Sequence, residues 1–359
     1  MTAPRPMAVP AGGGRPKRLL VVGAGAVGSF LGTLLGTVGY EVTLVRIFEP
    51  PSEKPVTLVR PDGTRAVVPV HRVTRTEDAL APDLILVAVK MPMLREALAP
   101  TLAWPDVPTV TVENGIGAEE IAAELRPAAP QIAGSLTASI RLASEDEVVR
   151  LGRGGIGLAA VDRAAAAALA TLLDDFGRAG LRAAELPDPK AMKWSKLLTN
   201  LIANASGAIL DMDPGEIYAD PRTFAVERRQ LLETLAVMAA LGVKPVKLPG
   251  AAVPWLARAI RLPAWLSRPI LRRIVGGARA GKLPSLRLHV RAAGEGPSPE
   301  QTEVEWMNGA VARAGERLGV PTPVNARLAE LVEDVAANPE RRQWLRHHPE
   351  RLRAEFEAP

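Results

Sequence analysis

The chain has 359 residues, of which 47% are hydrophobic, and it carries a formal net charge of +5. A chain of this length buries a large core, so we expect two domains rather than a single small module. It contains no cysteine, which excludes disulfides, thiolate catalysis and cysteine-ligated metals and suits a reducing cytoplasm, where we expect the protein. The four histidines show no metal-ligand spacing, so we predict no metal site.

The N-terminal end holds a leader and a stretch that resembles a membrane span. Residues 1–16 lack the apolar run of a signal peptide, and we expect them to form a flexible leader. No residue from 19 to 40 is charged, and hydropathy alone would suggest a membrane span there. Six glycines interrupt this stretch, however, and a strand, a turn and a helix explain their spacing better. We therefore predict no transmembrane segment.

The same stretch predicts a dinucleotide-binding turn. A short apolar strand at 17–22 is followed by the sequence GAGAVG and by a helix that runs to Val38. Gly23 permits a tight turn, Gly25 lets the backbone approach a pyrophosphate, and Gly28 lets the helix pack closely on the strand. The N–H groups at the helix N-terminus favour the phosphate charge. The residues expected to hold the cofactor are Gly23, Ala24, Gly25, Ala26, Val27 and Gly28.

The next predicted strand, residues 41–45, is followed by Arg46. NAD sites usually place Asp or Glu at this point to hold the ribose hydroxyls, whereas an arginine pairs with the 2′-phosphate of NADP. We therefore predict NADPH as the cofactor, and a solvated arginine at a strand end is the alternative. The segment from Thr57 to Thr64 contains a Pro-Asp-Gly turn and predicts a β-hairpin with a structural role.

Two further apolar strands are predicted at 84–89 and 109–112. Continuously apolar strands are typical of a parallel sheet that is covered on both faces. Lys90 follows the first of these strands, and Asn114 lies just beyond the second. Because ligands of open α/β sheets bind beyond the carboxyl ends of the strands, we expect Lys90 and Asn114 to face the cofactor or the substrate.

The C-terminal half is predicted to be helical. An alanine-rich helix from 163 to 179 precedes the proline-containing segment 186–189, where we place a domain boundary. Further helices are expected at 193–204, 221–241, 302–318 and 324–337.

One of these helices carries a polar face. Lys196, Asn200 and Asn204 are spaced four residues apart in KWSKLLTNLIAN, so on a helix all three lie on one side. An amine and two amides in an otherwise apolar stretch predict a site for an oxygen-rich substrate. An ordinary surface lysine is the alternative interpretation of Lys196.

With these motifs in place, the chain resembles the ketopantoate reductases, or 2-dehydropantoate 2-reductases. The resemblance is carried by GAGAVG at 23–28, Lys90, ENG at 113–115, KWSKLLTNLIAN at 193–204, TEVEWMNGAV at 302–311 and GVPTPVN at 319–325. Members of that family reduce ketopantoate to pantoate with NADPH, on the route to pantothenate and coenzyme A. The resemblance implies a small 2-oxo acid as the substrate.

The resemblance also implies a fold and a domain order. We expect an α/β protein in which an N-terminal Rossmann-type, doubly wound domain is followed by an all-helical domain. The expected parts are the leader at 1–16, the NADP-binding domain at 17–187, the helical substrate and dimerisation domain at 188–338, and a charged tail at 339–359.

Two residues match catalytic groups of the family. Lys196 matches the lysine that protonates the ketone oxygen while the nicotinamide delivers hydride to the neighbouring carbon. Glu303 matches an acid that accepts a hydrogen bond from the substrate hydroxyl, and a first-turn helix acid favoured by the dipole is the alternative. Chemistry supports the lysine independently, because reduction of a ketone places negative charge on oxygen, which an ammonium stabilises and protonates.

Other residues match binding groups of the family. Asn200 and Asn204 match polar groups on the lysine helix, and Ser285 matches a contact of the substrate carboxylate. Asn114 matches a residue near the nicotinamide, and Arg46 matches the arginine that receives the NADP phosphate.

One departure from the family pattern concerns the substrate pocket. Where the family usually carries Ser-Met-Leu-Gln-Asp, this chain has SLRLH at 285–289, and the stretch 293–299 is longer than the pattern. A reductase of a bulkier 2-oxo acid is therefore an alternative function. A β-hydroxyacid dehydrogenase is a further alternative, against which TEVEWMNG argues.

A second departure is the segment 244–284, which contains nine basic residues, two tryptophans and no acid. Leu266, Ile270 and Ile274 recur at helical spacing, which predicts an amphipathic basic segment. Contact with a membrane surface or an acidic substrate tail is one interpretation, and a noncatalytic NADP-binding protein could use it in this way. We favour a helical lid or a homodimer surface. No motif supports nucleic-acid binding.

Overall fold

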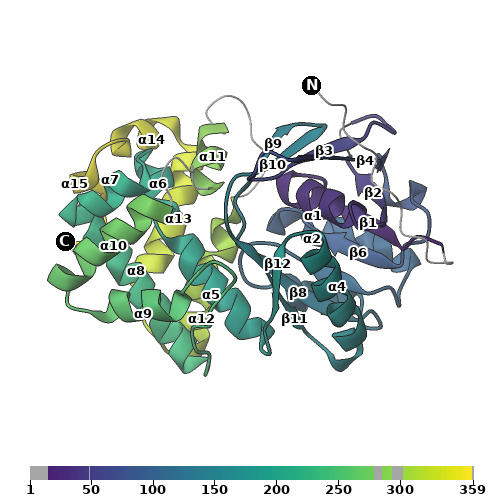
Figure 1. The fold of residues 1–359 in the computed structure, drawn as a ribbon. Helices are drawn as coiled ribbons and strands as arrows, with labels where there is room; N and C mark the ends of the chain where they lie inside the picture. The colour runs from purple at the N-terminus through teal and green to yellow at the C-terminus, as the bar shows by residue number, and fades with distance from the viewer. Residues whose placement is uncertain (1–14, 48, 279–284, 293–301, 358–359) are drawn as a thin grey trace. The chain divides into compact units, whose positions relative to one another are not determined.

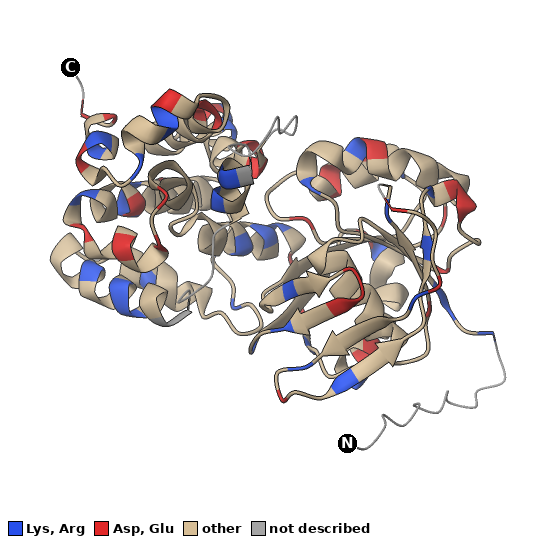
Figure 2. Cartoon of the chain, turned by 90° about the horizontal axis from the view of Figure 1, so that it is seen from above, with Lys and Arg blue, Asp and Glu red and all other residues tan. Residues whose placement is uncertain are grey.

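The computed structural model describes residues 15–47, 49–278, 285–292 and 302–357 (Figure 1). Most of the predicted leader and the predicted long stretch at 293–299 lie outside these ranges. Basic and acidic residues are interspersed on many of the helices (Figure 2).

By internal contacts the chain divides into two compact units. Unit 1 takes in the chain up to Glu113, with Gly117–Met192 and Leu248–Ala251. Unit 2 takes in Asn114–Ile116, Lys193–Lys247 and the residues from Ala252 onward. Each unit therefore takes one short segment from the other half of the sequence. Unit 1 includes Leu248–Ala251, and unit 2 includes Asn114–Ile116.

Unit 1 is built on an eight-stranded sheet with the order β12-β11-β8-β7-β6-β1-β2-β5. Neighbours from β5 to β8 are parallel, whereas β11 runs antiparallel to β8 and parallel to β12. The order β5-β2-β1-β6-β7-β8 is the doubly wound arrangement, so the predicted fold class is confirmed. The strands are β1 (Arg18–Val22), β2 (Glu41–Val45), β5 (His71–Val73), β6 (Leu84–Val87), β7 (Thr109–Thr111), β8 (Gln131–Leu136), β11 (Gly155–Ala160) and β12 (Arg182–Glu185).

A smaller, four-stranded sheet has the order β4-β3-β10-β9. Strands β3 (Val56–Val59) and β4 (Arg65–Val68) pair in antiparallel fashion, which confirms the predicted hairpin. Strands β9 (Ile140–Ser144) and β10 (Glu147–Arg150) form a second antiparallel pair, and β3 joins β10 in parallel.

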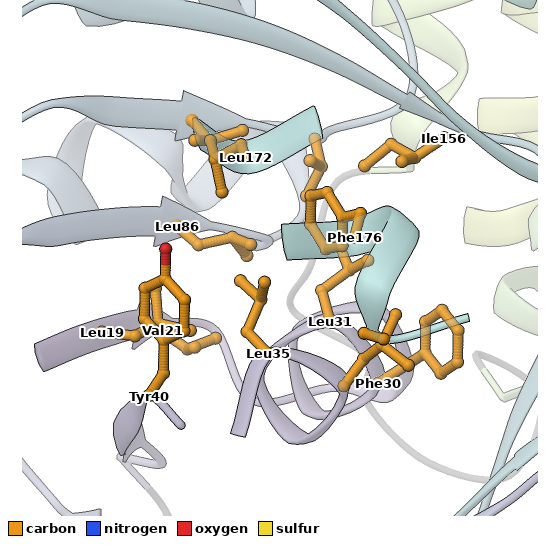
Figure 3. Close-up of a cluster of buried hydrophobic side chains, with 14 of the residues drawn as sticks. Leu19, Val21, Phe30, Leu31, Leu35, Tyr40, Leu86, Ile156, Leu172 and Phe176 are labelled. Carbon is orange, nitrogen blue, oxygen red and sulfur yellow. The ribbon is translucent and has the colours of Figure 1, made fainter. Parts of the chain in front are cut away.

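Helix α1 (Ala26–Gly36) contacts strands of both sheets and buries every residue from Gly28 to Leu35. This environment explains the uncharged stretch in the sequence, because a helix covered on all sides needs no polar face. Phe30 and Leu31 of α1 pack in the core that also includes Leu86 of β6 (Figure 3). Among the described residues, no helix is long and apolar enough to cross a membrane.

The remaining helices of unit 1 connect the strands. The core of Figure 3 includes Leu172 and Phe176 of α4, both at most 1% exposed. The helical segments are η1 (Thr76–Asp78), η2 (Met91–Met93), α2 (Leu94–Leu98), η3 (Ala99–Ala103), α3 (Ala118–Leu125), η4 (Arg163–Ala165) and α4 (Ala166–Arg178), where η denotes a 3-10 helix.

Unit 2 is helical, as predicted. Several of its helices begin with proline, which suits the first turn because its missing N–H needs no partner there. Residues 339–357, expected as a charged tail, include two helices in which Leu345 and Leu352 are fully buried. The helices are α5 (Pro189–Leu201), α6 (Ala205–Leu210), α7 (Pro214–Ala219), α8 (Pro221–Ala240), α9 (Val253–Arg261), α10 (Ala264–Ala278), α11 (Ser285–Ala292), η5 (Glu303–Trp306), α12 (Asn308–Leu318), α13 (Pro323–Ala337), α14 (Pro339–Leu345) and α15 (Pro349–Ala354).

Two of the predicted helices are interrupted. The helix expected at 193–204 ends at Leu201, and the helix expected at 302–318 is divided by Met307 into η5 and α12. Met307 has φ −109° and ψ −94°, which is outside the helical region. Both interruptions occur where the chain makes the contacts of the candidate site.

Candidate active site

Helix α5 presents two of the predicted polar residues. Lys196 and Asn200 are one turn apart on α5, and both are partly buried. Asn204 is not on this helix, so the prediction that one helix carries all three residues is wrong. The chain turns at Ala203, which has a left-handed φ of 49°, and Asn204 precedes α6 as its N-cap residue.

A buried carboxylate stabilises this turn. Glu227 of α8 is fully buried, and its Oε2 accepts hydrogen bonds from the Ala203 N–H at 2.8 Å and the Tyr218 hydroxyl at 3.1 Å. Its Oε1 accepts hydrogen bonds from the Ser206 hydroxyl at 2.5 Å and from Gln230 Nε2 at 2.8 Å. The left-handed conformation costs a residue with a Cβ about 1–2 kcal/mol, and these hydrogen bonds offset that cost.

The amide of Asn200 is paired with Asn114. Asn200 Nδ2 donates a hydrogen bond to Asn114 Oδ1 at 3.0 Å, within unit 2. The following residues attach the loop to η5, because Ile116 N donates to the Trp306 carbonyl at 3.0 Å. Gly115 has φ 98°, and a Cβ there would lie 2.6 Å from the Trp306 carbonyl oxygen. Only glycine suits this position, which explains the glycine of the ENG sequence.

Asn204 makes a second set of contacts. It is 4% exposed, and its Nδ2 lies 3.5 Å from both Ser285 Oγ and Met307 Sδ. Its Oδ1 accepts a hydrogen bond from the Leu286 N–H at 3.2 Å, in the first turn of α11. The structure thus brings Ser285, which is exposed, next to Asn204.

Glu303 is the first residue of η5 and is partly buried. Thr302 caps this turn by accepting a hydrogen bond from the Val304 N–H at 3.3 Å, and Val304 is fully buried. The turn ends at Trp306, the residue that holds the loop of Asn114. Glu303 therefore lies on η5, which contacts the loop of Asn114 through Trp306. Lys196 lies one turn before Asn200, which contacts the same loop.

The predicted cofactor loop lies in unit 1. Gly23 has φ 95°, and a Cβ on Gly28 would lie 2.1 Å from the Gly23 carbonyl oxygen, so the loop is tightly closed against the protein. Gly25 differs, because apart from Gly25 and its chain neighbours no heavy atom of the described residues lies within 4 Å of a Cβ built there. Gly25 is also the N-cap of α1 and supplies no side-chain acceptor to the helix N-terminus. An open approach to free N–H groups fits a phosphate.

Two basic residues follow strands of the main sheet. Arg46, after β2, forms an ion pair with Glu49 at 2.5 Å, and the side chain of Arg46 is 14% exposed. The Nη1 atom of Arg46 is buried and has no hydrogen-bond partner among the described residues. A guanidinium with one unsatisfied nitrogen fits an anionic ligand. Lys90 is exposed and lies three residues after β6, as the N-cap residue of η2.

The helix that carries Ser285 is held by ion pairs that the sequence motifs do not predict. Arg287 is 6% exposed and pairs with Asp211 at 2.8 Å and Asp213 at 2.5 Å, and Arg291 pairs with Asp211 at 2.7 Å. Burial alone would raise the pKa of Asp211, but the hydrogen bonds from Arg287 and Arg291 lower it below its ordinary value. Arg287 of the SLRLH sequence therefore anchors α11 to the segment between α6 and α7.

Among the described residues, no cluster of three or more His, Asp or Glu side chains is placed to hold a metal ion. The residues predicted for the site are two ionisable side chains, Lys196 and Glu303, the carboxamides of Asn114, Asn200 and Asn204, and the hydroxyl of Ser285, and hydrogen bonds join Asn114 with Asn200 and Asn204 with Ser285. Such a set can transfer a proton and bind oxygen atoms.

Comparison with known proteins identifies the family. Residues 19–163 match the protein family described as ketopantoate reductase PanE/ApbA. Residues 188–336 match the family described as the C-terminal part of ketopantoate reductase PanE/ApbA. A 2-dehydropantoate 2-reductase from Pyrobaculum aerophilum is 33% identical over 226 residues, which cover 62% of this chain and 68% of that protein. The chain belongs to the ketopantoate reductase family. The resemblance inferred from the sequence motifs is thus confirmed, and the protein is an oxidoreductase acting on CH–OH or ketone groups.

Other members of the ketopantoate reductase family align with a larger part of this chain. A 2-dehydropantoate 2-reductase from Archaeoglobus fulgidus is 28% identical over 326 residues, or 89% of this chain and 98% of that protein. Among solved structures, the PanE/ApbA family ketopantoate reductase from Ralstonia eutropha JMP134 superposes with a TM-score of 0.72 at 22% identity, covering 90% and 99% of the two chains. A D-mandelate dehydrogenase with NADH and anilino(oxo)acetate gives 0.71 at 22% identity, with the same coverage. Both structural likenesses concern the fold.

Proposed function

We propose that the protein reduces ketopantoate to pantoate with NADPH and that Lys196 donates the proton. Family membership supports the class of reaction. The observation that carries the assignment is the position of Lys196 on α5, one turn before an asparagine whose amide bonds Asn114 at 3.0 Å. The absence of cysteine suits a reducing cytoplasm, where we propose that the reaction takes place.

The chemistry requires a hydride at the ketone carbon and a proton at the ketone oxygen. Bound NADPH supplies the hydride. As the carbonyl π electrons move to oxygen, the Lys196 ammonium stabilises the developing charge and transfers its proton, leaving a neutral amine that regains a proton from solvent. The pair of Asn114 and Asn200 uses one N–H of Asn200, so three amide N–H groups of the pair can bind substrate oxygens.

The other predicted residues bind the remaining parts of the substrate. Ser285 and Asn204 offer a hydroxyl and an amide to the substrate carboxylate, and their proximity supports this role. Glu303 offers a carboxylate that accepts a hydrogen bond from the substrate hydroxyl. A site that hydrogen-bonds a hydroxyl rejects analogues that lack it, so these contacts would select hydroxylated 2-oxo acids.

A second candidate substrate is a 2-oxo acid with a bulky apolar side chain. The observation that favours it is the altered α11, where Arg287 fixes the segment that carries Ser285. D-mandelate dehydrogenase, which shares the fold, is described in a ternary structure with NADH and anilino(oxo)acetate.

A substrate panel distinguishes the two candidates. We expect kcat/KM to be highest for ketopantoate when NADPH oxidation is followed with ketopantoate, pyruvate and phenylglyoxylate as substrates. The same panel with NADH measures the cofactor preference. A higher kcat/KM for phenylglyoxylate than for ketopantoate would replace the first assignment by the second.

The role of Arg46 is tested by cofactor preference. Replacing Arg46 with alanine is expected to raise the KM for NADPH by about 10- to 100-fold, since a hydrogen bond to a charged group contributes about 1.5–3 kcal/mol. The KM for NADH should stay unchanged, because NADH has no 2′-phosphate. The matched variant Glu49→Gln removes the ion-pair partner of Arg46 and should not raise the KM for NADPH. An equal rise for both cofactors in Arg46→Ala would contradict a phosphate-binding role.

A further inference from the structure

The outer surfaces of α9 and α10 carry an unusual set of exposed residues. Trp255 is 50% exposed and Trp265 is 73% exposed. The basic face comprises Trp255, Arg258, Arg261, Trp265, Arg272 and Arg273, all of which are exposed.

The packing of the two helices produces this face. Helix α9 buries Val253 and Ile260 completely, and α10 buries Leu271 and Val275 to 2% exposure or less. The inner stripe of α10 therefore runs through residues 267, 271 and 275, one position after the predicted stripe at 266, 270 and 274, whose side chains are partly buried. With the aliphatic residues turned inward, the arginines and tryptophans face outward.

The composition of the exposed surface is restricted. From Ala252 to Gly276 every exposed residue is Arg, Trp, Pro, Ala or Gly, and the one hydroxyl-bearing residue, Ser267, is fully buried. The surface thus combines guanidinium cations with apolar groups and lacks side-chain amides and hydroxyls. A layer of lipid headgroups offers phosphates to the cations and a hydrated apolar boundary to the tryptophan rings, whereas the sequence contains no nucleic-acid-binding motif.

Acids of the described residues do not neutralise the positive charge of the basic face. Within the described residues, no acid forms an ion pair with the four arginines of the face, although arginines elsewhere in unit 2 pair with acids, as Arg313 does with Glu305. A second copy of the chain is a poor partner, because a two-fold interface would place these arginines opposite one another. For these exposed residues we therefore favour a membrane surface over the helical lid or homodimer surface predicted from the sequence.

We propose that the basic face binds the surface of membranes that contain anionic phospholipids. Guanidinium groups pair with lipid phosphates, and tryptophan rings are stable at the level of the headgroups, where one part of the ring is apolar and the other hydrated. Binding of this kind is peripheral, in agreement with the lack of a membrane-spanning helix among the described residues.

The full-length protein tests this proposal by co-sedimentation with phosphatidylcholine vesicles, made with and without phosphatidylglycerol. We expect binding only to the anionic vesicles and a bound fraction that falls as salt increases. The double variant Arg272→Gln/Arg273→Gln should lower the partition coefficient about 25-fold, because each arginine near an anionic surface contributes about fivefold. Adding Trp265→Ala to this double variant should lower the partition coefficient further.

The matched control removes two exposed arginines elsewhere in unit 2. Arg317→Gln/Arg353→Gln should keep the wild-type partition coefficient, and thermal melting should show that both double variants are folded. Equal binding to neutral vesicles, or equal loss in the control, would overturn the proposal. Tighter binding to an RNA homopolymer or to polyglutamate than to anionic vesicles would also overturn it, in favour of another polyanion. Reductase activity without vesicles should not change, since none of these residues is in the candidate active site.

Discussion

Replacing Lys196 with alanine is expected to lower kcat for ketone reduction by about 10²- to 10⁴-fold, the usual contribution of a positioned general acid. The affinity for NADPH should remain unchanged, because the glycine-rich loop lies in unit 1. Steady-state kinetics with ketopantoate and a fluorescence titration with NADPH measure the two quantities. In the wild-type enzyme, kcat should decline at alkaline pH as the donor loses its proton, and this decline should be absent from the variant.

The helix offers a matched control for this result. Lys190 is an exposed lysine in the first turn of the same helix, and Lys190→Ala should leave kcat unchanged. Partial rescue of Lys196→Ala by added ethylamine would indicate that the missing group is an amine. If kcat fell by less than about tenfold, with the alkaline decline intact, another group would be the proton donor.

Replacing Glu227 with alanine is expected to reduce the free energy of unfolding by about 3–5 kcal/mol, because it leaves up to four buried donors without their acceptor. Urea denaturation followed by circular dichroism measures the change. Since the turn at Ala203 sets the position of Asn204, the KM for the 2-oxo acid should rise as well.

Two variants bracket the effect of Glu227. Glu227→Gln keeps the size of the side chain and one acceptor oxygen, so its loss of stability should be smaller than that of alanine. Glu316→Ala removes an exposed glutamate from α12 and should change stability by less than about 0.5 kcal/mol. Unchanged stability in Glu227→Ala would mean that the carboxylate does not hold the turn.

The nucleotide-binding half of the fold was predictable because its signals are local. The predicted strands at 17–22 and 41–45 match β1 and β2 within one residue, and those at 84–89 and 109–112 match β6 and β7 within two. Each is a short apolar run bounded by glycine, proline or charge. The glycines between β1 and α1 are required by contacts only a few residues away, as between Gly28 and the Gly23 carbonyl.

The turn after α5 was not predictable, because its cause is distant in the sequence. Nothing between Leu201 and Ala205 departs from a helical pattern, and the break depends on a carboxylate 24 residues further along. The break at Met307 likewise follows Trp306, which contacts the loop of Gly115. This loop lies about half the length of the chain before Trp306 in the sequence. Helical periodicity predicts which residues lie on one helix. It contains no information on hydrogen-bond acceptors that other helices supply.

The exchange of short segments between the units has a consequence for dissection of the enzyme. Leu248–Ala251 belongs to unit 1, where the Thr137 hydroxyl donates to the Pro249 carbonyl, and Asn114–Ile116 belongs to unit 2. A fragment that ends at Pro187 would lose the first segment, and one that begins there would lose the amide partner of Asn200. We therefore expect neither half to be stable as an independent module, and we expect the chain to melt in one cooperative transition, because unfolding of either unit removes a segment of the other.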